Sequence, residues 1–346
     1  MARRKTRTVD LALQGGGAHG AFTWGVLDRL LEETALEFEG ISATSAGAMN
    51  AAALKTGLVA GGSREAARKA LDGFWGEIAR LGASPSNPLL AWVRAFAPTT
   101  SNLADAIEAS PGWQFGDTLT RMFSPYDLNP FNLNPLRDLL SEKLDFDAVC
   151  RQCAPHLFVG ATNVRSGKIK VFQGPEVSVD AILASTALPT LFQAVEIEGE
   201  AYWDGGYTGN PPLFPLFYET ETRDVVIVHV NPIVRQEVPR SSREILNRMN
   251  EVSFNAALLG ELRAVAFVRR LIAEGRIAQG TMKDVLVHSI QDEETMRKLG
   301  VATKVHVDAA LIANLKEAGR VAADAFLRAN WRDIGTRSSI DIEGLL

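Results

Sequence analysis

The chain has 346 residues, of which 46% are hydrophobic and 22% are charged, and its formal net charge is -5. These values are typical of an ordinary globular α/β protein with a large core and no affinity for nucleic acid. No run reaches the roughly 18 uncharged apolar residues that a membrane-spanning helix needs. The basic residues 1–7 are a poor signal peptide, so we expect a solvated tail and a cytoplasmic protein.

The first predicted elements are a strand, a glycine-rich turn and a helix. A mostly apolar run from Thr8 to Leu13 stops at the turn Gly15-Gly16-Gly17-Ala18-His19-Gly20. Apolar residues then recur at helical spacing from Phe22 to Leu31. The backbone N–H groups of such a turn can stabilise an anionic oxygen.

The ligand of this turn has two interpretations. The pattern Gly15-x-Gly17-x-x-Gly20 is also the fingerprint of dinucleotide binding, and Glu37 or Glu39 lies about 20 residues on, where a ribose-binding acid is expected. No Lys-Ser or Lys-Thr follows Gly20, which argues against a phosphate-binding loop for nucleoside triphosphates. The turn can therefore hold a pyrophosphate or the oxyanion of a tetrahedral intermediate.

A second small-residue turn favours the oxyanion. The next predicted strand, from Leu36 to Ile41, leads to Ser45, and an alanine-rich helix follows. A serine at such a corner is strained and exposes its hydroxyl, provided that the residues two before and two after it are small. These are Ala43 and Gly47; the usual pattern has glycine at both, so Ala43 is a departure. A dinucleotide site has no need of such a serine.

A carboxylate follows much later in the chain. A small-residue turn from Ala184 to Pro189 precedes an apolar run that ends at Tyr202-Trp203-Asp204-Gly205-Gly206. If Asp204 faces Ser45, it can accept the hydroxyl proton as a general base. Taken alone, Asp-Gly predicts only a tight turn.

These four motifs, in this order, resemble the patatin-like phospholipases, which are lipid acyl hydrolases with a Ser-Asp dyad. The resemblance implies that Ser45 is the nucleophile, that Asp204 is its general base and that the chain needs neither cofactor nor metal. The oxyanion hole would consist of the N–H groups of Gly15, Gly16 and Gly17. The supporting turn residues would be His19, Gly20, Gly47, Gly205 and Gly206. The family often carries arginine or lysine where this chain has His19.

The histidines and cysteines offer little competing chemistry. His229 and His288 lie in or beside apolar runs that predict strands, so neither is expected to be the base of a triad. Cys150 and Cys153 form a C-x-x-C unit, but no second pair or histidine cluster accompanies them. We expect a reduced pair.

The alternation of strands and helices predicts an α/β fold with a mostly parallel central sheet and helices on both faces. The domain boundaries that we expect are a basic tail at 1–8, an acyl hydrolase domain at 9–231 and a mainly helical extension at 232–346 packed on the same core. Prolines and aromatic residues crowd the region from about 81 to 135. This insertion is expected to form a cap over an acyl-chain pocket, with a stabilising insertion or a dimer contact as the alternatives.

The predicted function is a serine acyl hydrolase, such as a phospholipase A, that cleaves carboxylic esters of lipids through an acyl-enzyme. The partner is then a lipid or other ester, and transient contact with a membrane or granule surface is compatible with the sequence. The helical extension is similar to that of intracellular polyhydroxyalkanoate depolymerases, so a polyester is an alternative substrate. A nucleotide-binding oxidoreductase and a lipid-binding protein inactivated by Ala43 are alternatives of other classes. The sequence does not set the oligomeric state.

Overall fold

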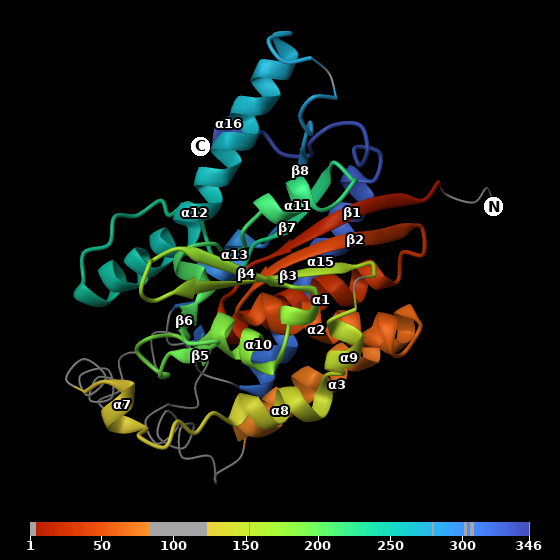
Figure 1. Cartoon of the computed structure of the whole chain (residues 1–346). Helices are drawn as coiled ribbons and strands as arrows, with labels where there is room; N and C mark the ends of the chain where they lie inside the picture. Colours follow the sequence, from red (N-terminus) through yellow and green to blue (C-terminus); the bar gives the residue numbers. More distant parts are fainter. Residues whose placement is uncertain are drawn as a thin grey trace.

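The computed structural model describes residues 5–83, 123–151, 153–278, 280–300, 303–304 and 308–345. The strands are β1 (Arg7–Leu13), β2 (Leu36–Thr44), β3 (His156–Asn163), β4 (Ile169–Gln173), β5 (Val195–Ile197), β6 (Glu200–Asp204), β7 (Asp224–Val228) and β8 (Leu286–Ile290). Within the described residues they form one eight-stranded sheet, in the order β5-β6-β3-β2-β1-β7-β8 with β4 paired to β3 (Figure 1). From β3 to β8 in this order the pairs are parallel. The predicted α/β fold with a mostly parallel sheet is confirmed.

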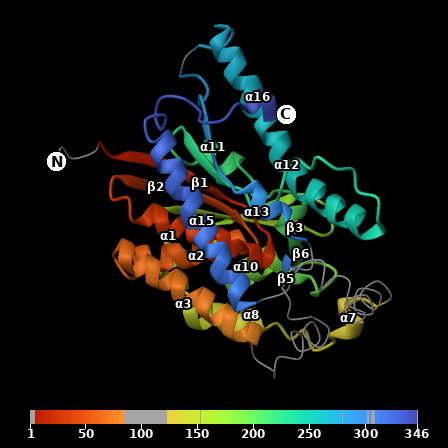
Figure 2. The same ribbon diagram turned by 180° about the vertical axis from the view of Figure 1, so that it is seen from behind.

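Helices cover both faces of this sheet (Figures 1 and 2). The helices are α1 (Gly20–Leu31), α2 (Ala46–Val59), α3 (Arg64–Ala83), α7 (Pro125–Leu128), α8 (Pro135–Lys143), α9 (Phe146–Val149), α10 (Val179–Thr186), α11 (Phe214–Tyr218), α12 (Ser242–Ala273), α13 (Glu293–Arg297), α15 (Ala309–Asn330) and α16 (Ile342–Leu345). Among the described helices, none combines the length and the apolar character that a bilayer span requires.

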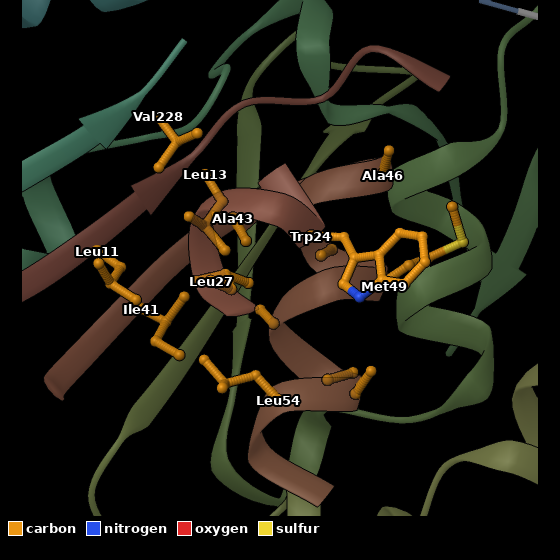
Figure 3. Packing of buried hydrophobic residues seen from close by; sticks show 14 of the residues in the cluster. Leu11, Leu13, Trp24, Leu27, Ile41, Ala43, Ala46, Met49, Leu54 and Val228 are labelled. Atoms are coloured by element: carbon orange, nitrogen blue, oxygen red, sulfur yellow. The ribbon is translucent and has the colours of Figure 1, made fainter. Parts of the chain in front are cut away.

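Alternation along the central strands divides the core into two clusters. Leu11 and Leu13 of β1 belong to the larger cluster, which includes side chains of α1, α2 and α15, as Figure 3 shows in part. Ala12, between them, belongs to the second cluster, with Leu216 of α11 and Leu258 of α12. Because successive side chains of a strand point to opposite faces, one strand contributes to both clusters.

The helices of the C-terminal region begin where their capping residues predict. The Ser241 hydroxyl accepts a hydrogen bond from Glu244 N–H, and the Glu244 carboxylate accepts one from Ser241 N–H, which forms a capping box at the start of α12. Asp308 accepts from the N–H groups of Ala310 and Leu311 at the start of α15. The helical character expected of residues 232–346 is visible in these two helices.

The C-terminal region is integrated into the same fold. β8 extends the sheet by pairing with β7, and α15 packs along α1 (Figure 2). A Cβ added to Gly25 of α1 would lie 1.9 Å from the Lys316 oxygen, and one added to Gly319 of α15 would lie 2.0 Å from the Phe22 oxygen. The two helices thus meet backbone to backbone, and Arg320 adds an ion pair to the buried Asp28.

The observed boundaries differ from the expected ones in three places. β1 begins at Arg7, within the expected tail, because Arg7 N–H donates to Ala35 O at 2.8 Å. α3 continues to Ala83, past the start of the expected insertion at 81–135, and residues 84–122 of that insertion lie outside the described part of the chain. Residues 184–186, interpreted as a turn, form the last turn of α10, which ends ahead of Pro189.

Candidate active site

Ser45 occupies the sharp corner between β2 and α2. Its backbone has φ 55° and ψ -124°, a conformation that costs on the order of 1–3 kcal/mol for a residue with a Cβ. Gly47 is needed beside it, because an added Cβ would lie only 2.3 Å from the Leu13 oxygen. The predicted strand-to-helix elbow is therefore present, and it places the serine at the carboxyl end of β2.

Ala43 is accommodated on the core side of this corner. Its side chain is fully buried in the larger cluster, where Figure 3 shows it near Leu13. On the opposite face, Thr44 Oγ1 donates to Gly209 O at 2.7 Å. The extra methyl group of Ala43 fills core volume, which speaks against its being a lesion of the elbow.

The strand register brings Asp204 to the same corner. β2 pairs with β3 up to Thr44, opposite Gly160, and β6 pairs with β3 with Asp204 opposite Ala161. The other edge of β3 is occupied by β4 over residues 158–162, so β6 follows β2 along one shared edge. Asp204 therefore lies just beyond the end of β2, where Ser45 stands.

The Asp204 carboxylate is almost completely buried, and one of its two oxygens accepts a hydrogen bond. Its Oδ1 accepts from Gly206 N–H at 2.7 Å, whereas Oδ2 has no aligned hydrogen-bond partner in the described part of the chain. Burial raises the pKa of Asp204 to about 6, although the Gly206 N–H and the Ser45 hydroxyl each lower it. The carboxylate is thus ionised at neutral pH, with one oxygen available to accept a proton.

Ser185 connects the Ser45 corner to β3, a role that the sequence did not indicate. Its Oγ accepts from Ser45 N–H at 2.8 Å and donates to Gly160 O at 2.6 Å. The last turn of α10 is thereby fixed to both β2 and β3. The small residues around Ser185 were the only signal of a close approach here.

The glycine turn lies against Ser45. A Cβ added to Gly15 would be 2.6 Å from Ser45 Cβ, so these two motifs are in contact. The Gly15 N–H, however, already donates to Asn210 Oδ1 at 2.6 Å. This donor is engaged within the protein. Of the expected three, the N–H groups of Gly16 and Gly17 remain, for which the described residues show no acceptor.

The carbonyl groups of the turn are held from behind. Gly15 O accepts from Asn231 Nδ2 at 2.8 Å, and Gly16 O accepts from His19 N–H at 3.2 Å. In a trans peptide the C=O and the following N–H point in opposite directions. These two bonds therefore fix the directions of the Gly16 and Gly17 N–H groups.

His19, His229 and His288 do not lie where a histidine could serve as the base for Ser45. His19 is buried, its Nε2 lies 2.7 Å from Thr303 Oγ1, and burial with the nearby Lys304 ammonium lowers its pKa to about 3. Burial likewise lowers the pKa of His229 to about 4. His288 pairs with Asp224 at 2.8 Å, near the amino end of β7.

The structure removes the basis of the dinucleotide interpretation. Glu37 lies opposite Thr8 near the start of β1. Five residues of strand, about 17 Å, separate Thr8 from Leu13, and the glycine turn comes after Leu13. Glu39 accepts from the N–H groups of Glu221 and Thr222 at 2.7 and 2.8 Å. Both acids lie toward the amino end of β2, so neither can bind a ribose whose phosphates sit at the turn.

The C-x-x-C unit lies elsewhere. Cys150 and Cys153 are free thiols, near α9 and the start of β3. In the described residues, no group of three or more His, Cys, Asp or Glu side chains gathers at a distance that could hold a metal ion.

Three comparisons relate this chain to known proteins. The family model for patatin-like phospholipase matches residues 11–217. The chain belongs to this family. Membership supports lipid acyl hydrolysis in general as its activity. A search of curated proteins gives no match. Among solved structures, VipD from Legionella pneumophila is similar at 15% identity and a TM-score of 0.40, over 93% of this chain and 67% of VipD.

Several contacts of this patatin-like site come from residues that the sequence did not single out. Asn210 and Asn231 hold Gly15, and Lys304 donates to Asn231 Oδ1 at 2.8 Å. The Asn-Pro pairs at 210–211 and 231–232 signal turns, but nothing local connects them to Gly15.

Proposed function

We propose that this patatin-like protein is a serine lipid acyl hydrolase that cleaves carboxylic esters with Ser45 as nucleophile and Asp204 as general base. The observation that carries the proposal is the shared edge of β3, which brings the end of β2 and the end of β6 together. The strained conformation of Ser45 and the half-satisfied, buried Asp204 support it further.

The reaction follows from these groups. Ser45 Oγ attacks the ester carbonyl carbon while its proton passes to Asp204 Oδ2. The carbonyl oxygen becomes an oxyanion toward the Gly16 and Gly17 N–H groups, and losing one such donor typically costs about 100- to 1,000-fold in rate. Collapse breaks the ester C–O bond, and Asp204 returns the proton to the leaving alcohol. Asp204 then takes a proton from water, whose oxygen attacks the acyl carbon. The acyl C–O bond to Ser45 breaks, and Asp204 returns the proton to Ser45 Oγ as the acid leaves.

The substrate class rests on the family, and the insertion is the segment that we propose to shape the pocket. In its described part, Phe131 is 84% exposed. The Tyr126 hydroxyl accepts from Ala194 N–H at 3.3 Å, and Gln193 donates to Asn129 O at 2.7 Å. These contacts attach the insertion to the segment between α10 and β5, which leads to the strand of Asp204.

The first test is labelling by a fluorophosphonate probe, with the modified peptide mapped by mass spectrometry. We expect labelling at Ser45, release of p-nitrophenol from medium-chain esters, and loss of both in Ser45→Ala. Asp204→Asn should reduce turnover by about 1,000-fold or more, because no general base remains. The labelling rate of the natural sequence should fall below about pH 6, where Asp204 becomes protonated.

The matched control is Asp145→Asn. Asp145 is exposed and caps α9, and asparagine caps a helix equally well, so this variant should keep full activity. A folded protein that is neither labelled nor active would overturn the proposal. With labelling established, hydrolysis of phospholipid, triacylglycerol and polyhydroxybutyrate in parallel assigns the ester.

A further inference from the structure

Thr303 and Lys304 lie against the glycine turn, outside the region that matches the family model. A Cβ added to Gly17 would lie 2.2 Å from the Lys304 oxygen, and Gly17 itself has φ +58°. The neighbouring Thr303 contacts the His19 ring. The C-terminal region therefore packs directly on the turn that holds the candidate oxyanion donors.

The Lys304 side chain reaches the amides that hold this turn. Its Nζ donates to Asn231 Oδ1 at 2.8 Å and to Asn250 Oδ1 at 3.0 Å, and it lies 5.2 Å from the centre of the Phe254 ring. Asn250 and Phe254 belong to α12. A partly buried ammonium group is thus held between α12 and the segment that follows β7.

This contact favours one orientation of the Asn231 amide, the same one in which Asn231 Nδ2 donates to Gln14 Oε1 at 3.3 Å. An ammonium group has only donors, so it must meet the amide oxygen. The amide nitrogen then points the other way, where Asn231 Nδ2 donates to Gly15 O at 2.8 Å. Without Lys304 the amide oxygen loses its charged donor, and the hydrogen bonds from Asn231 Nδ2 to Gly15 O and Gln14 Oε1 are left to hold the amide.

The orientation of Asn231 is transmitted through a single peptide plane. The Gly15 carbonyl and the Gly16 N–H belong to the same trans peptide and point in opposite directions. Asn231 Nδ2, at 2.8 Å from the Gly15 oxygen, therefore aims the Gly16 N–H, with a longer contact of 3.4 Å from Asn210 Nδ2 to the same oxygen. Three hydrogen bonds connect Lys304 to the oxyanion. They run from Lys304 to Asn231, from Asn231 to Gly15 O, and from Gly16 N–H to the oxyanion.

We propose that Lys304 is a positioning residue of the active site, which sets the Asn231 amide and thereby the Gly16 oxyanion donor. The inference rests on the proposed hydrolase function. It gives the C-terminal region a part in the chemistry of the site. Lys304 does not need to touch the substrate for this role.

The charge of Lys304 is sensitive to pH in this setting. Burial lowers its pKa to about 8, while the carboxylates of Glu251 and Asp204 raise the pKa and Arg235 lowers it. Among the described residues, His19 also lies close to Lys304, and its pKa of about 3 keeps it neutral over this range. Neutral Lys304 can accept as well as donate, so its hold on the amide weakens above about pH 8.

The test compares Lys304→Met, Asn231→Ala and the double variant, with melting temperatures measured for each. We expect Lys304→Met to lose about 10- to 100-fold in kcat with KM nearly unchanged, since a donor is misaligned and not removed. If Lys304 acts through Asn231, the double variant is no slower than Asn231→Ala alone. Lys298→Met is the control, because the exposed Lys298 pairs only with Glu294 among the contacts described for it.

The outcomes separate the two proposals. Absence of Ser45 labelling in the natural sequence would remove the hydrolase proposal, whatever the variants do. With labelling present, a kcat of folded Lys304→Met within threefold of the natural sequence, or losses that multiply in the double variant, would overturn the role of Lys304. A second measurement needs no Lys304 variant: the rate of Ser45 labelling should decline between pH 7 and 9.5 in the natural sequence but stay flat in Asn231→Ala. A flat profile in both would also overturn it.

Discussion

At the scale of single residues, the general-base role that we propose for Asp204 comes with a cost in stability. A general base must be ionised, yet burial in the corner between β3 and β6 favours the neutral carboxyl and raises its pKa from 3.8 to about 6. The folded protein therefore binds this proton more tightly than the unfolded chain does. Ionising the buried group destabilises the fold progressively as the pH rises from about 4 to about 6.

Asp204→Asn should consequently be inactive and more stable at neutral pH. Asparagine keeps an oxygen for the Gly206 N–H but carries no charge, so the gain at pH 7 reaches up to about 3 kcal/mol for a shift of about two pKa units. At pH 4, where the carboxyl is protonated in the folded state, the difference should disappear. Denaturant unfolding at pH 4 and pH 7 measures this.

The control for this prediction is again Asp145→Asn, whose stability should follow that of the natural sequence at both pH values. An Asp204→Asn variant that is less stable at pH 7 than at pH 4, relative to the natural sequence, would contradict the account. It would mean that the contacts of the carboxylate outweigh its desolvation.

At the scale of elements, α15 is attached to α1 by close backbone contact. Gly25 and Gly319 allow the two helices to approach until each faces a carbonyl of the other, and Arg320 pairs with Asp28 between them. Lys316 lies over the Trp24 ring at 4.0 Å. This interface anchors the C-terminal region on the face of the sheet that carries α1 and α2.

Gly319→Ala should therefore destabilise the protein, although alanine is the better helix former. The added methyl group would lie 2.0 Å from the Phe22 oxygen, so the helices must separate, and overpacking of this kind costs about 1–3 kcal/mol. Gly260→Ala in α12 is the matched control, because no heavy atom lies within 4 Å of its added Cβ. That variant should gain about 0.5–1 kcal/mol. Equal midpoints of urea unfolding for the two variants would contradict this packing.

The elements also show what the sequence could predict. Signals carried by adjacent residues were sufficient for the turn at Gly15 and the elbow at Ser45. α10 was misjudged because its Ala184-Ser185-Thr186 end combines small residues with a nearby proline, a composition that helix ends and turns share.

At the scale of the whole molecule, the rest of the site depends on contacts between distant segments. Lys304 and Asn231 are separated by 73 positions, and Asn231 and Gly15 by 216. Neither hydrophobic periodicity nor turn residues can predict these contacts. They follow from the order of the strands and from the packing of α12 against the sheet. The same holds for Gly15, whose N–H is engaged by Asn210, 195 positions away. The sequence could thus single out Ser45 and Asp204 as a pair, but not the groups that hold the glycine turn beside them.

The last prediction concerns residues 232–346 as a unit. Removing them would strip β8 from β7, expose the apolar face of α1 beneath α15, and leave Asn231 without Lys304. A bare edge at β7 and an uncovered apolar surface both favour association with other chains. We expect a chain of residues 1–231 to aggregate or to unfold without a cooperative transition, as measured by sedimentation and thermal unfolding.

The control is a chain cut at one exposed point. A protease site introduced after Arg276, in the exposed loop between α12 and β8, leaves every one of these contacts in place once the chain is cleaved. The two pieces should elute together, unfold in one transition and keep the labelling of Ser45. A soluble chain of residues 1–231 that unfolds cooperatively and still hydrolyses esters would contradict this view, since the family-matched region would then hold its own core and its own oxyanion turn. If the short chain fails while the cut chain succeeds, the C-terminal region completes both the core and the site through contacts alone.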